Sequence, residues 1–334
     1  MILQKTCLLI IPKKFYFFEK NITDALNDKG YKVTVSNDEY PEGILGKIMG
    51  KLQLPFVFIK TYKIIYNRYL KDKSYDVALI FKGRGMSGKL IMAIEKSVKK
   101  IIAYNWDSFK YNPGPLKWYR SVSQYFTFDY DDAAKYNIPV VELFTSFTAT
   151  LPKQKNIKYD LSYIVRNHSE RLQYIDAILN ILKPESVFIY IYEMNVFTFI
   201  ENFIKNPRLY LKYRKYIHNK PLSYADYTKV INDSVFTVDY AHSDQTGITM
   251  RCYEAVKMNT KLITNNTHIS KSEYFNPSNT IVYNLNQHAD ILLKGIAKCK
   301  TLPFSAKTRD INDFIGEILG FNRNTEPAHL NLSM

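Results

Sequence analysis

The chain has 334 residues, of which 46% are hydrophobic and 23% are charged, a composition that excludes a disordered protein and suits two folded domains. No apolar run approaches the roughly 18 residues that a membrane-spanning helix needs. The three cysteines lie far apart and lack histidine partners at ligand spacing, which argues against a disulfide framework or a zinc site and favours a reducing cytoplasm. The formal net charge of +15 favours an anionic partner, such as nucleic acid, an anionic membrane surface or a phosphorylated substrate.

Strand and helix patterns alternate along the first part of the chain, which predicts a parallel sheet with crossover helices. Gly30 is a suitable left-handed C-cap for the first helix, and Ser87 is a candidate N-cap for the second. The strands are predicted at 7–12, 31–37, 75–83, 99–107, 125–129 and 140–147, and the helices at 17–30 and 87–97.

A polar, proline-containing stretch at 148–158 interrupts this pattern and predicts a domain boundary. The alternation then starts again, so we expect two Rossmann-like α/β domains that face each other across a cleft. The N-terminal domain is expected at 1–150 and the C-terminal domain at 157–305, with a last helix within 306–320 that packs back on the first domain. In the second domain, strands are predicted at 159–165, 185–192, 235–241, 260–266 and 280–284, and helices at 169–182, 223–234 and 286–298.

The sequence HSDQTG, residues 242–247, lies between a predicted strand and a predicted helix. Ligands bind at the carboxyl ends of strands in open α/β sheets, and the start of a helix attracts phosphate. Gly247 lets the backbone approach a ligand closely, and Thr246 or Thr249 can add a hydroxyl donor. Glu254 follows Thr246 by eight residues, a little over two helical turns, so its carboxylate can accept both hydroxyls of a ribose whose phosphates lie at the helix start.

Each polar residue of this corner also has an ordinary structural interpretation. Glu254 can be a surface carboxylate that pairs with Arg251 three residues earlier, and Arg251 can either make that pair or neutralise a diphosphate. His242 can be a solvated loop residue or part of a ligand site. Asp239 can satisfy backbone groups at the end of its strand.

The sequence TGITMRCYEAVKMNTKLITNN, residues 246–266, resembles the donor-site segment of bacterial GT-B glycosyltransferases, especially those that build lipopolysaccharide, O-antigen and capsule. Three further regions resemble the same enzymes, and together the similarity covers most of residues 75–285. These regions are YNWDSFKYN with QYFTFDYDDAAKYNI, then DLSYIVRNHSERLQYI, and then NKPLSYADYTKVINDSVFTVDY.

The resemblance implies an enzyme that moves a sugar from a nucleotide sugar to a bacterial surface-glycan acceptor, either lipid-linked or an oligosaccharide, without a metal ion. Two departures are visible. Related retaining enzymes have a second glutamate where this chain has Thr246, which favours a site other than the classical retaining one. Relatives also have glycine where Arg166 and Asn167 stand, and these residues are either a substituted phosphate contact or part of a loop that holds something else. The residues implied for donor-nucleotide binding are His242, Gln245, Thr246, Gly247, Thr249, Arg251, Glu254 and Arg166.

The first domain is expected to hold the acceptor. The Gly-rich sequence FKGRGMSGK lacks the spacing of a P-loop, and it is either a plain turn or a loop that presents Lys82 or Arg84 to the acceptor. The first domain contains no histidine, so its candidate general bases are carboxylates. Asp107 is the first candidate because it ends a strand, although it can also be an N-cap, and Asp38 and Glu42 follow.

The acids of FDYDD do not indicate a metal site. They contain an Asp-x-Asp pattern, which another glycosyltransferase fold uses to hold a divalent ion, but acids at this spacing are common and Asp131 is well placed to cap the next helix. We therefore expect no metal site there.

Basic residues and aromatic residues concentrate between residues 47 and 73, where seven Lys or Arg accompany one acid. On a helix, Phe58, Tyr62 and Tyr69 share one face and Lys60 and Lys63 the other, which is typical of a membrane-surface helix but also of a helix that packs on its own domain. A similar run at 210–220 can contact the membrane or bind an acceptor phosphate. We expect a cytoplasmic protein, peripheral on the inner face of the membrane.

Two other functions are also compatible with the sequence. Basic charge with interleaved tyrosine and phenylalanine suits single-stranded nucleic acid, but no RRM, KH or helix-turn-helix pattern is present, so we expect no nucleic-acid partner. A non-catalytic assembly partner would bind nucleotide sugar without turnover.

Overall fold

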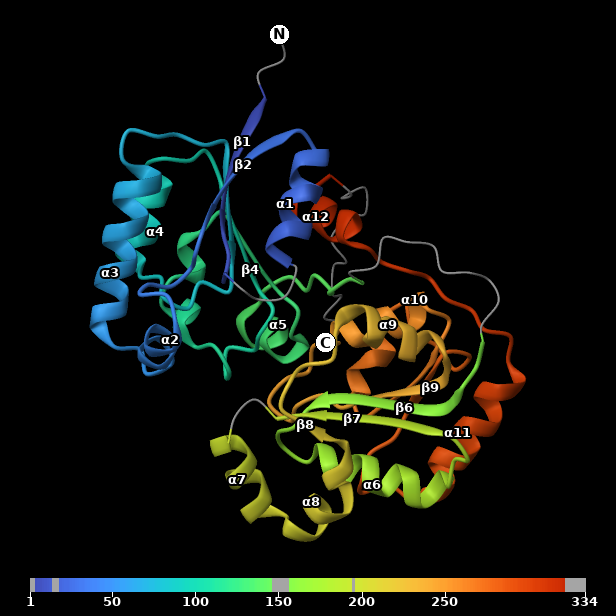
Figure 1. Ribbon diagram of the computed structural model, residues 1–334. Helices are drawn as coiled ribbons and strands as arrows, with labels where there is room; N and C mark the ends of the chain where they lie inside the picture. The colour runs from blue at the N-terminus through green and yellow to red at the C-terminus, as the bar shows by residue number, and fades with distance from the viewer. Residues whose placement is uncertain (1–3, 14–17, 146–155, 194–195, 322–334) are drawn as a thin grey trace, which may run out of the picture. The chain divides into compact units, whose positions relative to one another are not determined.

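The computed structural model describes residues 4–13, 18–145, 156–193 and 196–321, and Figure 1 shows its elements. The chain divides into two compact units. Unit 1 comprises Met1–Ser146 and Asp310–Met334, and unit 2 comprises Phe147–Arg309. Most of the stretch 148–158, predicted as the boundary, lies outside the described residues. Each unit is built on a parallel sheet covered by helices, which confirms the predicted class of two Rossmann-like α/β domains.

The sheet of unit 1 has five parallel strands in the order β2-β1-β3-β4-β5. Its central strands are continuous apolar runs because both of their faces are buried, as is usual in parallel sheets. The strand order reverses between β1 and β3. The strands are β1 (Lys5–Ile10), β2 (Tyr31–Ser36), β3 (Val77–Phe81), β4 (Ile101–Asn105) and β5 (Gln124–Thr127).

Helices cover both faces of this sheet, with α3 and α4 on one side and α1 and α12 on the other (Figure 1). The predicted caps are confirmed: Ser87 Oγ accepts a hydrogen bond from the Leu90 amide at 3.3 Å, and Gly30 is left-handed with φ +84°. The α-helices are α1 (Phe18–Asp28), α2 (Ile44–Lys51), α3 (Pro55–Ile65), α4 (Gly88–Glu95), α5 (Tyr130–Tyr136) and α12 (Ile311–Leu319); Tyr66–Leu70 is a π-helical turn, and Gly114–Lys117 and Tyr119–Ser121 are 3₁₀ turns.

The helix α12 belongs to unit 1 although unit 2 precedes it in the sequence. Its Phe314 is fully buried and packs on Phe144 and Tyr104, with ring centroids 4.6 and 5.0 Å apart. The side chain of Asp310 caps the helix, accepting from the amides of Asn312 and Asp313. This late segment therefore completes the core of unit 1.

The sheet of unit 2 has six parallel strands in the order β11-β10-β9-β6-β7-β8. The chain enters at β6, runs outward through β7 and β8, and returns to the other side of β6 at β9. The strand order thus reverses between β6 and β9. The strands are β6 (Tyr159–Arg166), β7 (Val187–Tyr192), β8 (Ile217–His218), β9 (Ser234–Asp239), β10 (Lys261–Thr264) and β11 (Thr280–Val282).

The helices α9 and α10 cover one face of this sheet, and α6 and α8 cover the other (Figure 1). Buried aromatic side chains such as Tyr163 and Tyr174 form much of the core with aliphatic residues of the strands. The elements are α6 (Arg171–Leu182), α7 (Val196–Lys205), α8 (Pro207–Tyr213), α9 (Tyr224–Asn232), α10 (Met250–Lys257) and α11 (Ala289–Thr301), with 3₁₀ turns at Arg214–Tyr216 and Thr267–Lys271.

Several local predictions are wrong. The apolar run predicted as a strand at 140–147 makes only isolated bridges, Thr127 with Val140 and Thr145 with Asp310, and its last two residues lie outside the described part. Asp129, not Asp131, caps α5, because its side chain accepts from the amides of Asp131 and Asp132.

The basic amphipathic helix predicted near residues 47–73 is divided into α2, α3 and the π-helical turn. Its apolar face is partly used for packing: Ile65 is buried in the core of unit 1, and Tyr62 and Tyr69 pack against that core. Most of the exposed apolar side chains lie outside that face: Ile48 on α2, Leu52 and Leu54 between the two helices, and Phe56 and Ile59 on α3. Of the predicted face, Tyr66 is also exposed. Among the described residues, none of the helices has the length and apolar character needed to span a bilayer.

Candidate functional site

Asp239 organises the corner of unit 2 at which the strand order reverses. It is the last residue of β9, and it is only 1% exposed. Its carboxylate accepts hydrogen bonds from Thr249 Oγ1 at 3.0 Å and from Arg251 at 3.1 Å, and a longer contact from Cys252 Sγ at 3.6 Å. These contacts fix the start of α10 against the end of β9.

The loop after β9 is longer than the sequence indicated. The helix α10 begins at Met250, and Thr249 is its N-cap residue but makes no side-chain capping bond, because its hydroxyl donates to Asp239. Asn266 Nδ2 donates to the carbonyl oxygens of Thr246 and Gly247, both at 3.1 Å. The first-turn amides of a helix have no partners within the helix, so the start of α10 can receive an anion.

Arg171, the first residue of α6, joins the ends of the two strands at the reversal. Its guanidinium donates to the carbonyl oxygens of Arg166 at 2.8 Å and Tyr240 at 3.2 Å. Burial lowers the pKa of Arg171. The Nε atoms of Arg171 and Arg251 are buried and have no hydrogen-bond partner within the described structure. Buried donors of this kind are normally satisfied, which suits a site that takes an anionic ligand.

Two histidine rings lie close to each other and near these arginines. His168 follows β6 and His242 follows β9, and their ring centroids lie 5.7 Å apart. Burial, followed by the neighbouring Arg171 charge, lowers the pKa of His168 to about 3, so that its ring is neutral at physiological pH. His242 Nδ1 accepts a hydrogen bond from the amide of Asp244 at 3.1 Å. Sequence reasoning missed His168, although its place just after β6 was the available signal.

Glu254 lies on the side of α10 that faces α9. It is 7% exposed and accepts hydrogen bonds from the hydroxyls of Tyr227 at 2.7 Å and Tyr224 at 3.5 Å. Burial raises its pKa to about 7, against the opposing effect of the Tyr227 hydrogen bond and the Arg251 charge. The interpretation of Glu254 as a surface carboxylate paired with Arg251 is therefore wrong, because the ion pair of Arg251 is with Asp239.

The remaining donor candidates lie at the same corner. The side chain of Arg166, at the end of β6, is exposed. The amide of Gln245 donates to the carbonyl oxygen of His242 at 3.0 Å and closes a turn of the loop. The structure thus brings His242, Gln245, Thr246, Gly247, Thr249 and Arg251 to one corner, adds Arg171 and His168, and places Glu254 toward α9.

A second polar cluster lies at the carboxyl edge of the sheet in unit 1. Lys82, just after β3, and Asp107, just after β4, form an ion pair with Nζ and Oδ2 2.5 Å apart. The amide of Arg84 donates to Asp38 Oδ2 at 3.1 Å. Burial raises the pKa of Asp38 to about 6, with Lys82 opposing the shift. Glu42 is separate and makes an exposed pair with Lys13.

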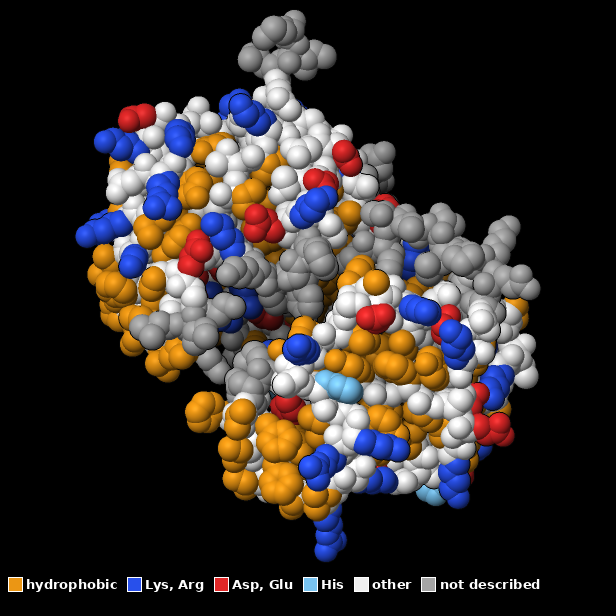
Figure 2. Space-filling model, in the orientation of Figure 1, with side chains coloured by type: hydrophobic (Ala, Val, Ile, Leu, Met, Phe, Trp, Pro, Cys, Tyr) orange, Lys and Arg blue, Asp and Glu red, His pale blue; other side chains and the backbone are white. Residues whose placement is uncertain are grey.

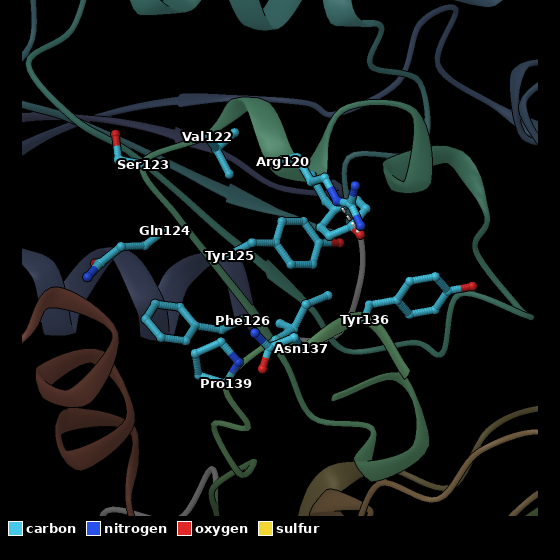
Figure 3. Close-up of a pocket in the computed structure, with 11 residues that line it drawn as sticks. Arg120, Val122, Ser123, Gln124, Tyr125, Phe126, Tyr136, Asn137 and Pro139 are labelled. Atoms are coloured by element: carbon cyan, nitrogen blue, oxygen red, sulfur yellow. Dashed lines mark hydrogen bonds between the residues drawn. The ribbon is translucent and has the colours of Figure 1, made fainter. Parts of the chain in front are cut away.

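A cavity of about 480 Å³ in unit 1 is lined by none of Lys82, Asp107 and Asp38. It lies beside the edge strand β5, and Figure 3 shows side chains from β5 and from the C-terminal end of α5 around it, including Tyr125, Tyr136 and Asn137. Among the described residues, no group of three or more His, Cys, Asp or Glu side chains is placed to hold a metal ion.

No family model and no curated protein matches the sequence. Several solved structures match the fold over nearly the whole chain. The lipopolysaccharide outer core galactosyltransferase WaaB in its apo form has a TM-score of 0.59 and 11% identity, covering 95% of this chain and 99% of its own. A glycosyltransferase from Rickettsia africae has a TM-score of 0.54 and 14% identity, with 90% and 89% coverage.

A UDP-GlcNAc 2-epimerase from Methanocaldococcus jannaschii, solved in complex with UDP-GlcNAc and UDP, has a TM-score of 0.53 and 12% identity, with 95% and 99% coverage. At these identities the similarities establish the fold alone, which is two Rossmann-like domains of the kind found in GT-B structures.

Proposed function

We propose that this protein is a glycosyltransferase that moves a sugar from a nucleotide-sugar donor to a bacterial surface-glycan acceptor of the lipopolysaccharide, O-antigen or capsule type. The observation that carries the proposal is the cationic corner of unit 2. Arg171, Arg251 and the start of α10 converge where the strand order reverses, which is the place where open α/β sheets bind nucleotides.

The diphosphate of the donor would lie against the loop at Thr246 and Gly247 and the first turn of α10. Arg251 is neutralised in part by Asp239, whereas the hydrogen bonds of Arg171 are made to carbonyl oxygens. Arg171 therefore brings a positive charge that an anionic ligand can balance, and exposed Arg166 can add a second contact. A neutral His168 would serve as a hydrogen-bonding group.

Glu254 would bind the ribose of the donor. Its Oε2 already accepts from Tyr227, and the contact of Oε1 with Tyr224 is long at 3.5 Å, so Oε1 is the oxygen available to a ribose hydroxyl. A carboxylate can accept from two hydroxyls at once. Charge that develops on the leaving diphosphate would be stabilised by the arginines and the helix start without a metal ion.

On the acceptor side, Asp107 is the proposed general base. It would take the proton of an acceptor hydroxyl, the oxygen would attack the anomeric carbon, and the nucleoside diphosphate would leave with the electron pair of the broken bond. Lys82 holds Asp107 in place. The buried carboxyl of Asp38 is the second candidate base in the same cluster.

A lipid-linked acceptor would require contact with a membrane, and we place this contact on what we call the α3 surface, formed by Ile48, Leu52, Phe56 and Ile59. These side chains are exposed, and Lys60 Nζ lies 5.5 Å from the Phe56 ring centroid. Apolar side chains with adjacent lysines suit an anionic lipid surface. The protein would accordingly be cytoplasmic and peripheral on the inner face of the membrane.

Calorimetric titration with UDP, GDP, dTDP and CMP and their sugars, with and without chelator, tests the donor site. We expect one nucleotide to bind, with an affinity that the chelator leaves unchanged. Binding of none of them, together with salt-sensitive binding of oligonucleotides, would reject the glycosyltransferase proposal in favour of a nucleic-acid-binding protein. Nucleotide-sugar binding without transfer to any membrane-extract acceptor would instead favour a non-catalytic assembly partner.

An epimerase is a second candidate, because the match to the UDP-GlcNAc 2-epimerase spans both chains almost completely. An epimerase changes the sugar of its nucleotide sugar in the absence of an acceptor, whereas a transferase needs the acceptor for turnover. Proton NMR of the nucleotide sugar that binds, incubated with the protein and without an acceptor, distinguishes an epimerase from a transferase. A new sugar-nucleotide epimer would support the epimerase.

A further inference from the structure

We propose that α7 of unit 2 inserts its outer face into an anionic lipid bilayer, as a contact separate from the α3 surface. No side chain of α7 is buried. Phe197, Val196 and Ile204 are 84%, 69% and 71% exposed. A contiguous apolar patch of this kind is unusual on a soluble protein and marks an interaction surface.

The helix is held by one face and leaves the other bare. On the inner face, Phe199 and Phe203 pack edge-on against the Tyr210 ring of α8, with centroids 5.4 and 6.0 Å apart. Asn202 donates to the buried carboxylate of Glu193 at 3.2 Å. Val196, Phe197, Ile200 and Ile204 follow the spacing i, i+1, i+4 and i+8, so they form one outward stripe.

The charges around α7 identify the occupant as an anionic surface. Between residues 196 and 220 there are six Lys or Arg and one acid, Glu201. Lys205 pairs with Glu201, and Lys212 pairs with Asp176. Of the others, Arg208 lies on α8 and Arg214 and Lys215 follow that helix, and all three are exposed and take part in none of the ion pairs found among the described residues. Lys220 lies beyond β8, where its carbonyl oxygen accepts from Tyr190.

Figure 2 shows hydrophobic side chains gathered over α7, with Lys and Arg side chains beside them toward α8. An apolar protein partner would explain the stripe but not the surplus of positive charge. An anionic bilayer explains both the apolar stripe and the positive charge, because its acyl chains surround the apolar side chains and its headgroups neutralise the lysines and arginines. This contact extends the proposed membrane association to unit 2.

Tryptophan fluorescence at the stripe tests this contact in the full chain. In a Phe197→Trp variant, vesicles of phosphatidylglycerol and phosphatidylcholine with brominated acyl chains should shift the added emission to shorter wavelength and quench it roughly twofold. Vesicles of phosphatidylcholine alone should have a much smaller effect. Leu293→Trp, at an exposed apolar position of α11 in the same unit, is the matched control and should not respond.

The outcomes distinguish membrane insertion of α7 from membrane binding through the α3 surface. If the variant sediments with vesicles but the emission at residue 197 is unquenched, α7 does not insert, and membrane association by the α3 surface stands. If the emission is already shifted without vesicles, protein covers the stripe, and the lipid contact is overturned in favour of a second copy or another part of the chain. A folded Phe197→Ser, Ile204→Ser variant should bind anionic vesicles several-fold more weakly.

Discussion

Glu254 makes the stability of the protein depend on pH. Burial raises the pKa of this carboxyl from 4.5 to about 7, so the folded chain keeps a proton that the unfolded chain has released. The stabilisation is therefore full below about pH 4.5 and is lost as the pH rises through 7. For Glu254→Gln, which does not titrate, we expect the loss of unfolding free energy between pH 5 and pH 8 to be smaller than in the native chain by up to roughly 3 kcal/mol.

Urea unfolding at the two pH values measures this difference. Asp38→Asn is a useful comparison, because the pKa of Asp38 is raised to only about 6. The loss of unfolding free energy that Asp38 causes should therefore be complete at a lower pH than the loss caused by Glu254. An identical pH dependence in the native chain and in Glu254→Gln would show that Glu254 does not titrate in this range.

Replacing Glu254 with alanine should also weaken nucleotide binding. Loss of the hydrogen bonds that the ribose hydroxyls donate to this carboxylate corresponds to about 1–2 kcal/mol, or roughly 5- to 30-fold in the dissociation constant. Calorimetry with the preferred nucleoside diphosphate measures the change, and Tyr227→Phe serves as a control that removes only the neighbouring hydroxyl. An unchanged affinity in a folded Glu254→Ala variant would remove Glu254 from the ribose site.

For Asp107→Asn we expect donor binding to persist while turnover falls by about 100-fold or more, because the amide cannot accept a proton. The variant keeps the shape of the side chain but breaks the ion pair with Lys82. Steady-state rates measure turnover, and calorimetry on the same preparation measures donor binding. A near-normal rate would leave Asp38 as the candidate base, and Asp38→Asn would then be the variant to measure.

At the scale of elements, one hydroxyl helps to fix the joint between β9 and α10. Thr249 Oγ1 donates to the buried carboxylate of Asp239 instead of capping its own helix. Thr249→Val has a similar shape but leaves that carboxylate with one donor fewer, which should lower the unfolding free energy by about 1–2 kcal/mol. Thr228→Val, at an exposed hydroxyl on α9, is the control, and equal effects in the two variants would show that the joint has no special role.

Most elements were predictable where the local signals agree. Apolar runs predicted the central strands, and Ser87 and Gly30 predicted helix ends. These features depend on residues that are close together in the sequence. The run at 140–147 is also largely apolar, but it pairs with β5 only at the bridge between Thr127 and Val140 and forms no ladder there. The helix α7 was missed because its apolar residues follow directly on the apolar strand β7.

The candidate site was predictable only in part for a related reason. The loop 242–247 and Glu254 are close together in the sequence, so their spacing was informative. The meeting of His168 with His242, and the bridge from Arg171 to Tyr240, join residues about seventy positions apart. Such contacts depend on the strand order, which places β6 beside β9, and a single sequence does not reveal that order.

At the scale of the whole molecule, the two proposed lipid contacts lie on different units. The α3 surface belongs to unit 1, and α7 belongs to unit 2. Replacing Phe56 and Ile59 with serine should reduce sedimentation with anionic vesicles roughly tenfold. Nucleotide affinity should be unchanged, because these two side chains belong to unit 1 and the proposed donor site belongs to unit 2. Met92→Ser, at an exposed apolar position on α4, is the control. Binding that survives the double replacement would assign the membrane contact to other residues.

The position of α12 in the sequence also affects the order in which the chain can fold during synthesis. Phe314 fills the core of unit 1 between Phe144 and Tyr104, yet it is translated after all of unit 2. A ribosome-bound chain that ends before α12 therefore exposes the aromatic surface that this helix will cover, while every strand of unit 2 is already available. The domain that is synthesised first is thus the one that is completed last.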